Sequence, residues 1–253
     1  PNGKDTVHFS TEDASGSTSQ AANVIEAVEA GSSLLLIDED TSATNFMIRD
    51  ELMQRVIHRD MEPITPFIER IRELYEEYGI STVIVAGSSG AYFHIADAII
   101  QMDRYMPKDI TTYAKKEAEA YPAISVPEQP AREPDFRRCP RPNPAFKGND
   151  RIKMKTMGRD GIMINKETID LRYVEQLTDS EQLTALGYCM RYAQKRLLDG
   201  RKSIRQIVDE LEKVIGKESL AGLCESSSSI SCMAMPRKQE IFACFNRYRG
   251  LKL

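Results

Sequence analysis

Two short aliphatic runs in the first half of the chain predict buried strands. Leu34–Asp38 reads LLLID and Thr82–Gly87 reads TVIVAG, and such continuous runs are typical of strands covered on both faces of a parallel sheet. A helix is predicted between them, because apolar residues recur at helical spacing from Phe67 to Tyr78, with Thr65 as its cap and Gly79 at its end. Strand, helix and strand in this order indicate a right-handed parallel crossover.

The second half of the chain changes character twice. Residues 121–150 contain seven prolines and predict an extended linker or a surface arm. Residues 151–172 predict a hairpin around the turn Gly158–Gly161, and residues 179–223 carry apolar stripes at helical spacing. Ser226–Ser229 is expected to be a flexible loop, and a last helix is expected from Pro236 to Tyr248. We therefore expect an α/β core over residues 1–120, an arm over 121–150 and a small α+β, mostly helical region over 151–253.

Composition excludes several classes of protein. The chain has 253 residues, enough for one large domain or two modest ones, and a net charge of −4 that gives no overall attraction to nucleic acid or to anionic membranes. No apolar run approaches the ~20 residues of a membrane span. The five cysteines form no CxxC pair and are expected to be reduced thiols of a cytoplasmic protein.

Two features near the amino-terminal end indicate phosphate chemistry. Asp38 and Glu39 follow the first aliphatic run, so they are expected at the carboxyl edge of the sheet, where open α/β sheets bind ligands. The small residues Ser15–Ser19 precede a predicted helix from Gln20 to Ala30, whose amino-terminal end favours an anion. Each feature alone also has a structural interpretation, an acidic strand end that solvates a turn or a capped helix start.

The spacing of these features resembles an ATP-binding cassette. Ser15 lies 23 residues before Asp38, similar to the distance from the LSGGQ signature to the Walker B aspartate. The segment DEDTSATN at Asp38–Asn45 is similar to DEPTSALD, which joins Walker B to the D-loop. With the block VIVAGSSGAYFHIADAIIQMD, these motifs resemble the bacterial family of predicted ATPases of the ABC class. The resemblance extends over the whole chain and is strongest over residues 10–115.

The resemblance implies a P-loop NTPase fold, a head-to-tail homodimer, and ATP with Mg²⁺ as ligands. Asp38 matches the Walker B residue that holds Mg²⁺ through water, and Glu39 matches the general base. The segment Gly87-Ser88-Ser89-Gly90 lies where cassettes carry a switch histidine. Ser88, the candidate catalytic residue here, or Ser89 can donate a hydrogen bond but carries no positive charge. The remaining ATP-binding positions are those of the signature, which contacts the γ-phosphate bound by the opposite protomer, and of the D-loop: Ser15, Gly16, Ser17, Thr18, Ser42 and Asn45.

The sequence contains no GxxxxGK[ST] motif, the loop whose backbone N–H groups cradle the phosphates. Asn2–Thr6 resembles only the end of such a motif and is expected to be a loop. Since the chain opens on Pro1, we expect the P-loop to come from sequence upstream. This chain alone is then expected to bind Mg·ATP poorly and to be inactive.

A basic arm gives the alternative function, a nucleic-acid (RNA) binding module with weak or no ATP hydrolysis. Residues 131–159 carry nine Lys and Arg residues against three carboxylates, and cations interleaved with aromatic residues can track a phosphate backbone and stack bases. The candidate contacts are Arg137, Arg138 and Arg141. The competing interpretation is a solubilising linker that wraps its own domain or docks on the partner protomer.

Overall fold

The computed structural model describes residues 11, 13–49, 51–57, 64–123, 134–143, 152–224 and 232–253. They form two compact units, Pro1–Glu133 and Pro134–Leu253, each of which is described by itself. The loops expected at Asn2–Thr6 and Ser226–Ser229 lie outside the described residues. No helix in the described part of the chain is long and apolar enough to cross a bilayer.

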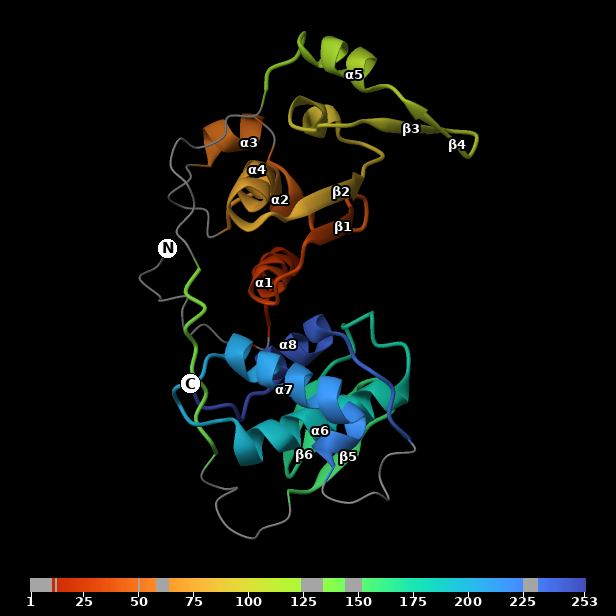
Figure 1. Cartoon of the computed structure of the whole chain (residues 1–253). Coiled ribbons are helices and arrows are strands. Elements are labelled where there is room, and N and C mark those ends of the chain that lie inside the picture. The colour runs from red at the N-terminus through yellow and green to blue at the C-terminus, as the bar shows by residue number, and fades with distance from the viewer. Residues whose placement is uncertain are drawn as a thin grey trace. The chain divides into compact units, whose positions relative to one another are not determined.

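A parallel pair of strands forms the centre of the first unit (Figure 1). Strand β1 (Leu34–Asp38) pairs with β2 (Ser81–Val85) in a register that sets Asp38 opposite Val85. The connecting helix α4 (Phe67–Tyr78) packs on β2 and ends at Gly79, whose φ of 66° is left-handed. This confirms the predicted strand, helix and strand, although the residue at the helix cap is Pro66, not Thr65.

Helix α1 (Gly16–Glu29) begins four residues before the predicted start at Gln20. Ser15 is its N-cap, and its side chain accepts a hydrogen bond from the backbone N–H of Thr18. A serine at this position satisfies a donor that the helix itself cannot. The signature-like residues Gly16, Ser17 and Thr18 therefore form the first helical turn, and the preceding turn is shorter than the sequence suggested.

One face of the parallel pair is exposed, which corrects the prediction of strands buried on both faces. Both strands alternate between exposed and half-buried positions. Apart from Asp38 and Ser81 at the strand ends, the exposed positions are aliphatic, with 73% of Leu36 and 65% of Val85 accessible. Aliphatic strands of a parallel sheet are normally covered on both sides, so this face lacks a covering layer in the described part of the chain.

The rest of the first unit follows the two strands. Its core includes Met47, Phe67, Leu74 and Ile80, each at most 1% exposed. The hydrophobic pattern did not predict the antiparallel hairpin or the short helices. These elements are α2 (Thr44–Met47), α3 (Glu51–Val56), the 3₁₀ helix η2 (Gly90–His94), β3 (Ile100–Asp103), β4 (Met106–Asp109) and α5 (Thr111–Ala118).

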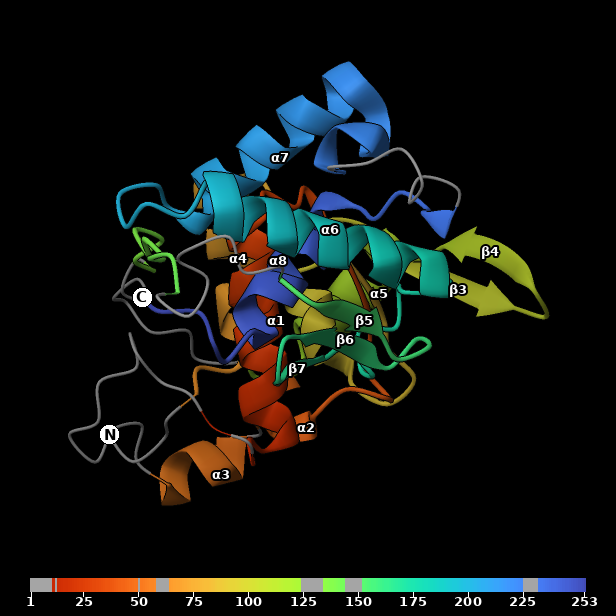
Figure 2. The same cartoon turned by 90° about the horizontal axis from the view of Figure 1, so that it is seen from below.

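The second unit packs helices on an antiparallel sheet (Figure 2). The predicted hairpin is present as β5 (Met154–Thr156) and β6 (Gly161–Ile164), and a third strand, β7 (Glu167–Asp170), extends it. Helix α6 (Ser180–Arg196) lies against this sheet and contacts the other helices. These are α7 (Ile204–Glu218), the 3₁₀ helix η4 (Ser219–Leu223) and α8 (Lys238–Arg247).

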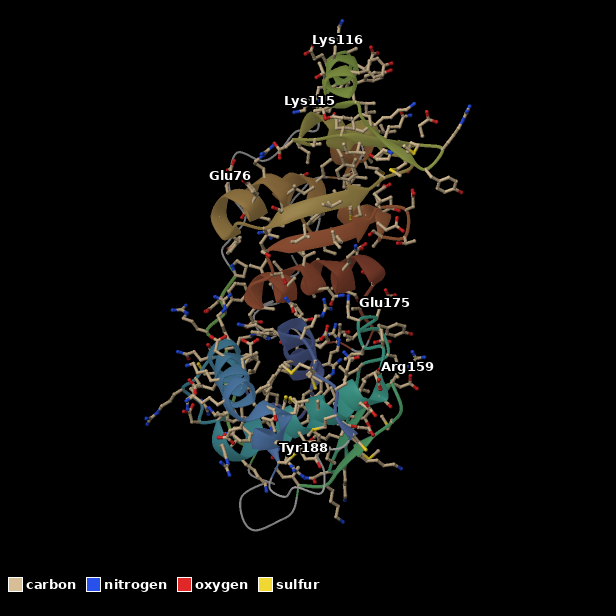
Figure 3. The ribbon with its side chains drawn as sticks, turned by 45° about the vertical axis from the view of Figure 1, so that its right-hand side comes forward. Glu76, Lys115, Lys116, Arg159, Glu175 and Tyr188 are labelled. Carbon is tan, nitrogen blue, oxygen red and sulfur yellow. The ribbon has the colours of Figure 1, made fainter. Side chains whose placement is uncertain are left out.

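The apolar stripe predicted on α6 is the centre of this second core. Leu183, Leu186, Met190 and Ala193 are fully buried. On another side of the helix lies Tyr188, which is labelled in Figure 3. The Arg191 guanidinium is 4.4 Å from its ring centroid, a cation–π contact. Helix α6 thus presents an apolar face to the sheet and an aromatic and basic face elsewhere.

Candidate functional site

Glu39 is the most buried acidic residue at the end of the parallel pair. It directly follows β1, its backbone N–H donates to the carbonyl of Val85 at 2.8 Å, and its side chain is 8% exposed. Ser88, which follows β2, donates from Oγ to Glu39 Oε2 at 3.4 Å. The structure therefore brings together two of the residues that the sequence predicted as catalytic, from segments 49 positions apart in the chain.

Tyr92 on η2 also lies near this carboxylate, which the sequence analysis missed. Burial, and secondly the negative charge of Glu39, raise the pKa of the Tyr92 phenol, so the ring stays protonated and neutral. Its hydroxyl donates to the carbonyl of Met47 at 3.5 Å. Tyr92 lies in the run AYFHIA, which has no clear hydrophobic period, so no local pattern indicates this contact.

Asp38 is exposed at the carboxyl end of β1, and its Oδ1 accepts a hydrogen bond from the backbone N–H of Asp40 at 3.1 Å. No cluster of three or more metal-ligating side chains is found among the described residues. Mg²⁺ at nucleotide sites does not need one, since it takes one or two carboxylates and completes its shell with water and substrate phosphates. An accessible carboxylate at the strand end fits that donor set, so Asp38 would hold the ion.

The predicted D-loop residue Ser42 is anchored to β1. Its Oγ donates to the carbonyl of Asp38 at 2.6 Å, and its N–H donates to the carbonyl of Glu39 at 3.1 Å. Asn45 lies in α2 with an exposed side chain. Ser42 is therefore part of the hydrogen-bonded strand end, whereas Asn45 is an exposed residue of α2.

The predicted signature residues form a capped helix start. Ser15 Oγ lies 3.0 Å from Thr18 Oγ1, and the side chains of both Ser15 and Thr18 are within the first turn of α1. The turn lies beside the D-loop, because a Cβ placed on Gly16 would meet the Cβ of Ala43 at 3.8 Å. The N–H groups of the first helical turn have no partner within the helix and point out of its amino-terminal end, so they suit an anion.

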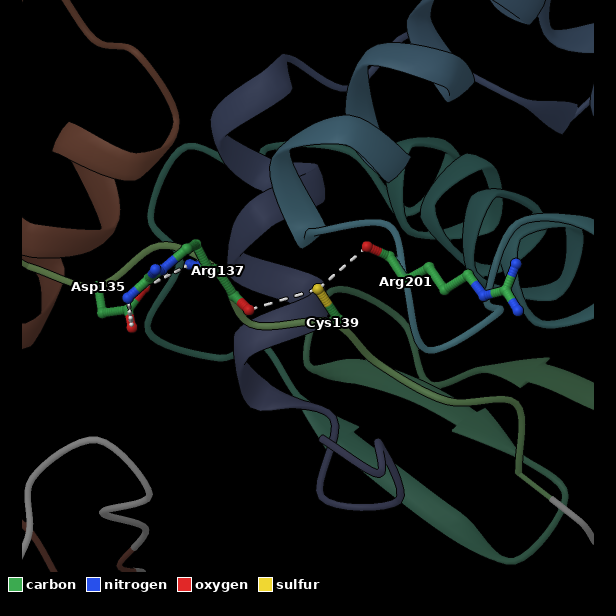
Figure 4. A network of polar contacts seen from close by, with 4 residues as sticks. All are labelled: Asp135, Arg137, Cys139 and Arg201. Atoms are coloured by element: carbon green, nitrogen blue, oxygen red, sulfur yellow. Dashed lines mark hydrogen bonds and ion pairs between the residues drawn. The ribbon is translucent and has the colours of Figure 1, made fainter.

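The candidate arm residues belong to the second unit, where residues 134–143 are held by several contacts (Figure 4). Arg137 forms an ion pair with Asp135 at 2.9 Å, and Arg138 donates to Asn246 Oδ1 at 2.9 Å. The N–H of Arg141 donates to the carbonyl of Lys252 at 2.7 Å. The Arg137 ion pair is internal to the segment and leaves its side chain exposed. The contacts of Arg138 and Arg141 reach the end of the chain and favour the interpretation that this part of the arm wraps its own domain.

Backbone bonds strengthen this attachment. The carbonyl of Pro140 accepts from the N–H of Gly200 at 3.0 Å, and the carbonyl of Arg138 accepts from the N–H of Ile204 at 3.1 Å. The Cys139 thiol donates to the carbonyl of Arg201 at 3.2 Å (Figure 4). Residues 134–143 therefore follow the loop before α7. The rest of the predicted arm, apart from residues 121–123 and 134–143, lies outside the described residues.

A parallel strand pair that ends in Asp-Glu, beside a capped helix start of small polar residues, is the arrangement of a nucleotide-binding α/β protein. Residues 1–135 match the family model of the ABC_ATPase P-loop domain. This range is more than half of the chain, and the chain belongs to the ABC_ATPase family. Membership indicates a nucleotide-binding, ATPase-type function.

The second unit matches a different family model. Residues 153–253 are similar to the MRB1590 C-terminal domain, a range that begins just before β5 and includes the rest of the chain. The comparison with curated proteins found no match. The two matched ranges agree with the division into two compact units.

Proposed function

We propose that this chain carries the signature and Walker B half of an ABC-class ATPase, which hydrolyses ATP between two head-to-tail protomers. Glu39 is the general base, Asp38 assists Mg²⁺, and Ser88 holds the Glu39 carboxylate. The observation that carries the proposal is the placement of Glu39. It is 8% exposed and next to an accessible Asp38, and its carboxylate meets Ser88 from the neighbouring strand.

This geometry suits proton abstraction. A general base must lie within hydrogen-bond reach of the attacking water and must stay ionised at the operating pH. Ser88 can orient the Glu39 carboxylate without neutralising it, since a hydroxyl donates a hydrogen bond but carries no charge. When bound, Mg²⁺ would offset the negative charge of the phosphates, and Asp38 is the accessible carboxylate for it.

The signature residues act on the other nucleotide in this proposal. Ser15, Gly16, Ser17 and Thr18 form a helix start whose N–H groups and hydroxyls can bind a γ-phosphate held by the opposite protomer. Ser42 and Asn45 of the D-loop follow β1 in the sequence. Ala43, which lies between them, is the residue beside this turn. The proposed dimer thus combines the strand end of one copy with the helix start of the other.

The P-loop is proposed to come from polypeptide outside this sequence. The matched range 1–135 contains no GxxxxGK[ST] motif. The exposed aliphatic face of β1 and β2 is the surface that further strands and helices of an α/β core would cover. The ATPase is therefore complete only with that added layer.

The test compares Glu39→Gln with Glu76→Gln in protein that includes the P-loop sequence. Glu76 is an exposed carboxylate on α4 of the same unit (Figure 3), so its variant controls for the loss of one charge. We expect Glu39→Gln to lower steady-state turnover by about 10²–10⁴-fold and to retain ATP binding, while Glu76→Gln behaves as wild type. Equal turnover in all three proteins would remove Glu39 from the mechanism.

A further inference from the structure

The side chain of Gln20, on the second turn of α1, is bound entirely by the segment that follows β1. Its Nε2 donates to Ser42 Oγ at 2.8 Å, and its Oε1 accepts from the backbone N–H of Ala43 at 2.8 Å. Nε2 also lies 3.9 Å from the sulfur of Met47. These contacts are partly buried, so they join α1 to the D-loop where water competes less.

The hydrogen bonds have only one consistent direction. A backbone N–H can only donate, so the oxygen of the Gln20 amide must face Ala43 and its nitrogen must face Ser42. The single hydroxyl proton of Ser42 is used toward the carbonyl of Asp38 at 2.6 Å. Ser42 Oγ therefore accepts from Gln20 and donates to β1, which makes a continuous chain from α1 to the backbone of the Walker B residue.

The two ends of this chain belong to different roles in the proposed ATPase. Gln20 follows the signature turn, and Gly16 of that turn lies beside Ala43, since a Cβ added at Gly16 would be 3.8 Å from the Ala43 Cβ. Asp38 begins the pair of carboxylates that act on the nucleotide of their own protomer. A shift of α1 is therefore transmitted to the strand end through atoms in direct contact.

We propose that Gln20 is a positioning residue that couples the signature turn to the Asp38–Glu39 pair. When the signature turn closes on a γ-phosphate at one site, Gln20 and Ser42 fix the position of the Asp38 backbone. The Glu39 carboxylate, which acts at the other site, is thereby positioned as well. The inference rests on the proposed head-to-tail ATPase. It adds a residue that takes no part in the chemistry and makes hydrolysis at the two sites interdependent.

The decisive variant is Gln20→Glu, which preserves the size of the side chain. The carboxylate can still accept from the N–H of Ala43, but it has no donor for Ser42 Oγ. We expect kcat to fall roughly 10- to 100-fold, as for a small misplacement of catalytic groups, and the Hill coefficient for ATP to fall toward 1. The dissociation constant for ATP and the thermal midpoint should stay near wild type.

Companion variants separate positioning from folding. Gln20→Ala and Ser42→Ala each break the hydrogen-bond chain from Gln20 to Asp38, so we expect each to lower kcat. The double variant should be no slower than either single variant. Ser42→Thr restores the hydroxyl and should recover part of the kcat that Ser42→Ala loses. Gln101→Ala, at an exposed glutamine on β3 of the same unit, is the matched control.

The outcomes distinguish this inference from the proposed function. If wild type hydrolyses ATP, Glu39→Gln does not, and Gln20→Glu and Ser42→Ala retain both kcat and cooperativity, the coupling role of Gln20 is wrong and the ATPase stands. A lower thermal midpoint with unchanged kcat would assign Gln20 a purely structural role and overturn the inference. If wild type with its P-loop sequence hydrolyses no ATP, both proposals fail together.

Discussion

The exposed face of the parallel strands gives a stability prediction that follows directly from the side-chain burial. Leu36 lies at the centre of β1 and is 73% exposed, whereas Leu74 of α4 is 1% exposed. We consider Leu36→Thr, which keeps a residue suited to a strand, beside Leu74→Ala. The two substitutions remove apolar groups from the same unit but from opposite environments.

The expected magnitudes differ because only buried surface contributes to folding. Full burial of a leucine contributes about 1.5–3 kcal/mol, and roughly a quarter of the Leu36 surface is buried, so Leu36→Thr should cost less than about 1 kcal/mol in this chain. Leu74→Ala removes a fully buried side chain and leaves a cavity, which costs about 2–5 kcal/mol.

Urea unfolding of the chain, followed by far-ultraviolet circular dichroism, measures both values. The same pair is then compared in protein that includes the P-loop sequence. There we expect the cost of Leu36→Thr to rise by about 1–2 kcal/mol, because the added layer buries this face. An equal and large cost for both variants in this chain would show that the face is already covered. A cost of Leu36→Thr that does not change with the P-loop sequence would show that the added sequence does not cover this face.

Two further predictions concern the second unit. Burial raises the pKa of the Cys189 thiol to about 12, so almost no thiolate exists there at pH 8. A thiol reagent should therefore label the exposed Cys232 first and reach Cys189 only in denaturant or above that pKa. Rapid labelling of Cys189 in the native protein, located by peptide mass mapping, would contradict its burial. If residues 134–143 bind single-stranded nucleic acid, replacing Arg137, Arg138 and Arg141 by Ala should weaken binding and reduce the slope of log K against log salt by about 2. An unchanged slope in a filter-binding titration would show that these arginines do not contact the phosphates.

Local patterns predicted much of the first unit. The aliphatic runs specified β1 and β2, and helical spacing specified α4 together with its end at Gly79, because these signals depend only on neighbouring residues. The start of α1 was placed four residues too late. Small polar residues suit both a turn and a first helical turn, and the Ser15 cap decided between them.

Other elements gave no distinct local signal. The hairpin β3–β4 has a two-residue turn with positive φ at Arg104 and Tyr105. Turns of this type usually carry Gly, Asn or Asp, so the sequence did not indicate it. Strand β7 was missed because no glycine or proline separates it from β6 in the sequence. The turn between the two strands uses Asn165 at a φ of 55°.

The sequence by itself determined the order of strand, carboxylate pair and small polar turn, and through this order the class of chemistry, since each motif is a run of adjacent residues. The tertiary structure decided which of them meet. It placed Ser88 on Glu39, set Tyr92 beside the same carboxylate, and joined Gln20 to Ser42 and Ala43. These contacts join residues 22 to 53 positions apart, and no local pattern encodes such pairs, because they arise from the parallel register of β1 and β2 and from the packing of α1 and η2 around its end.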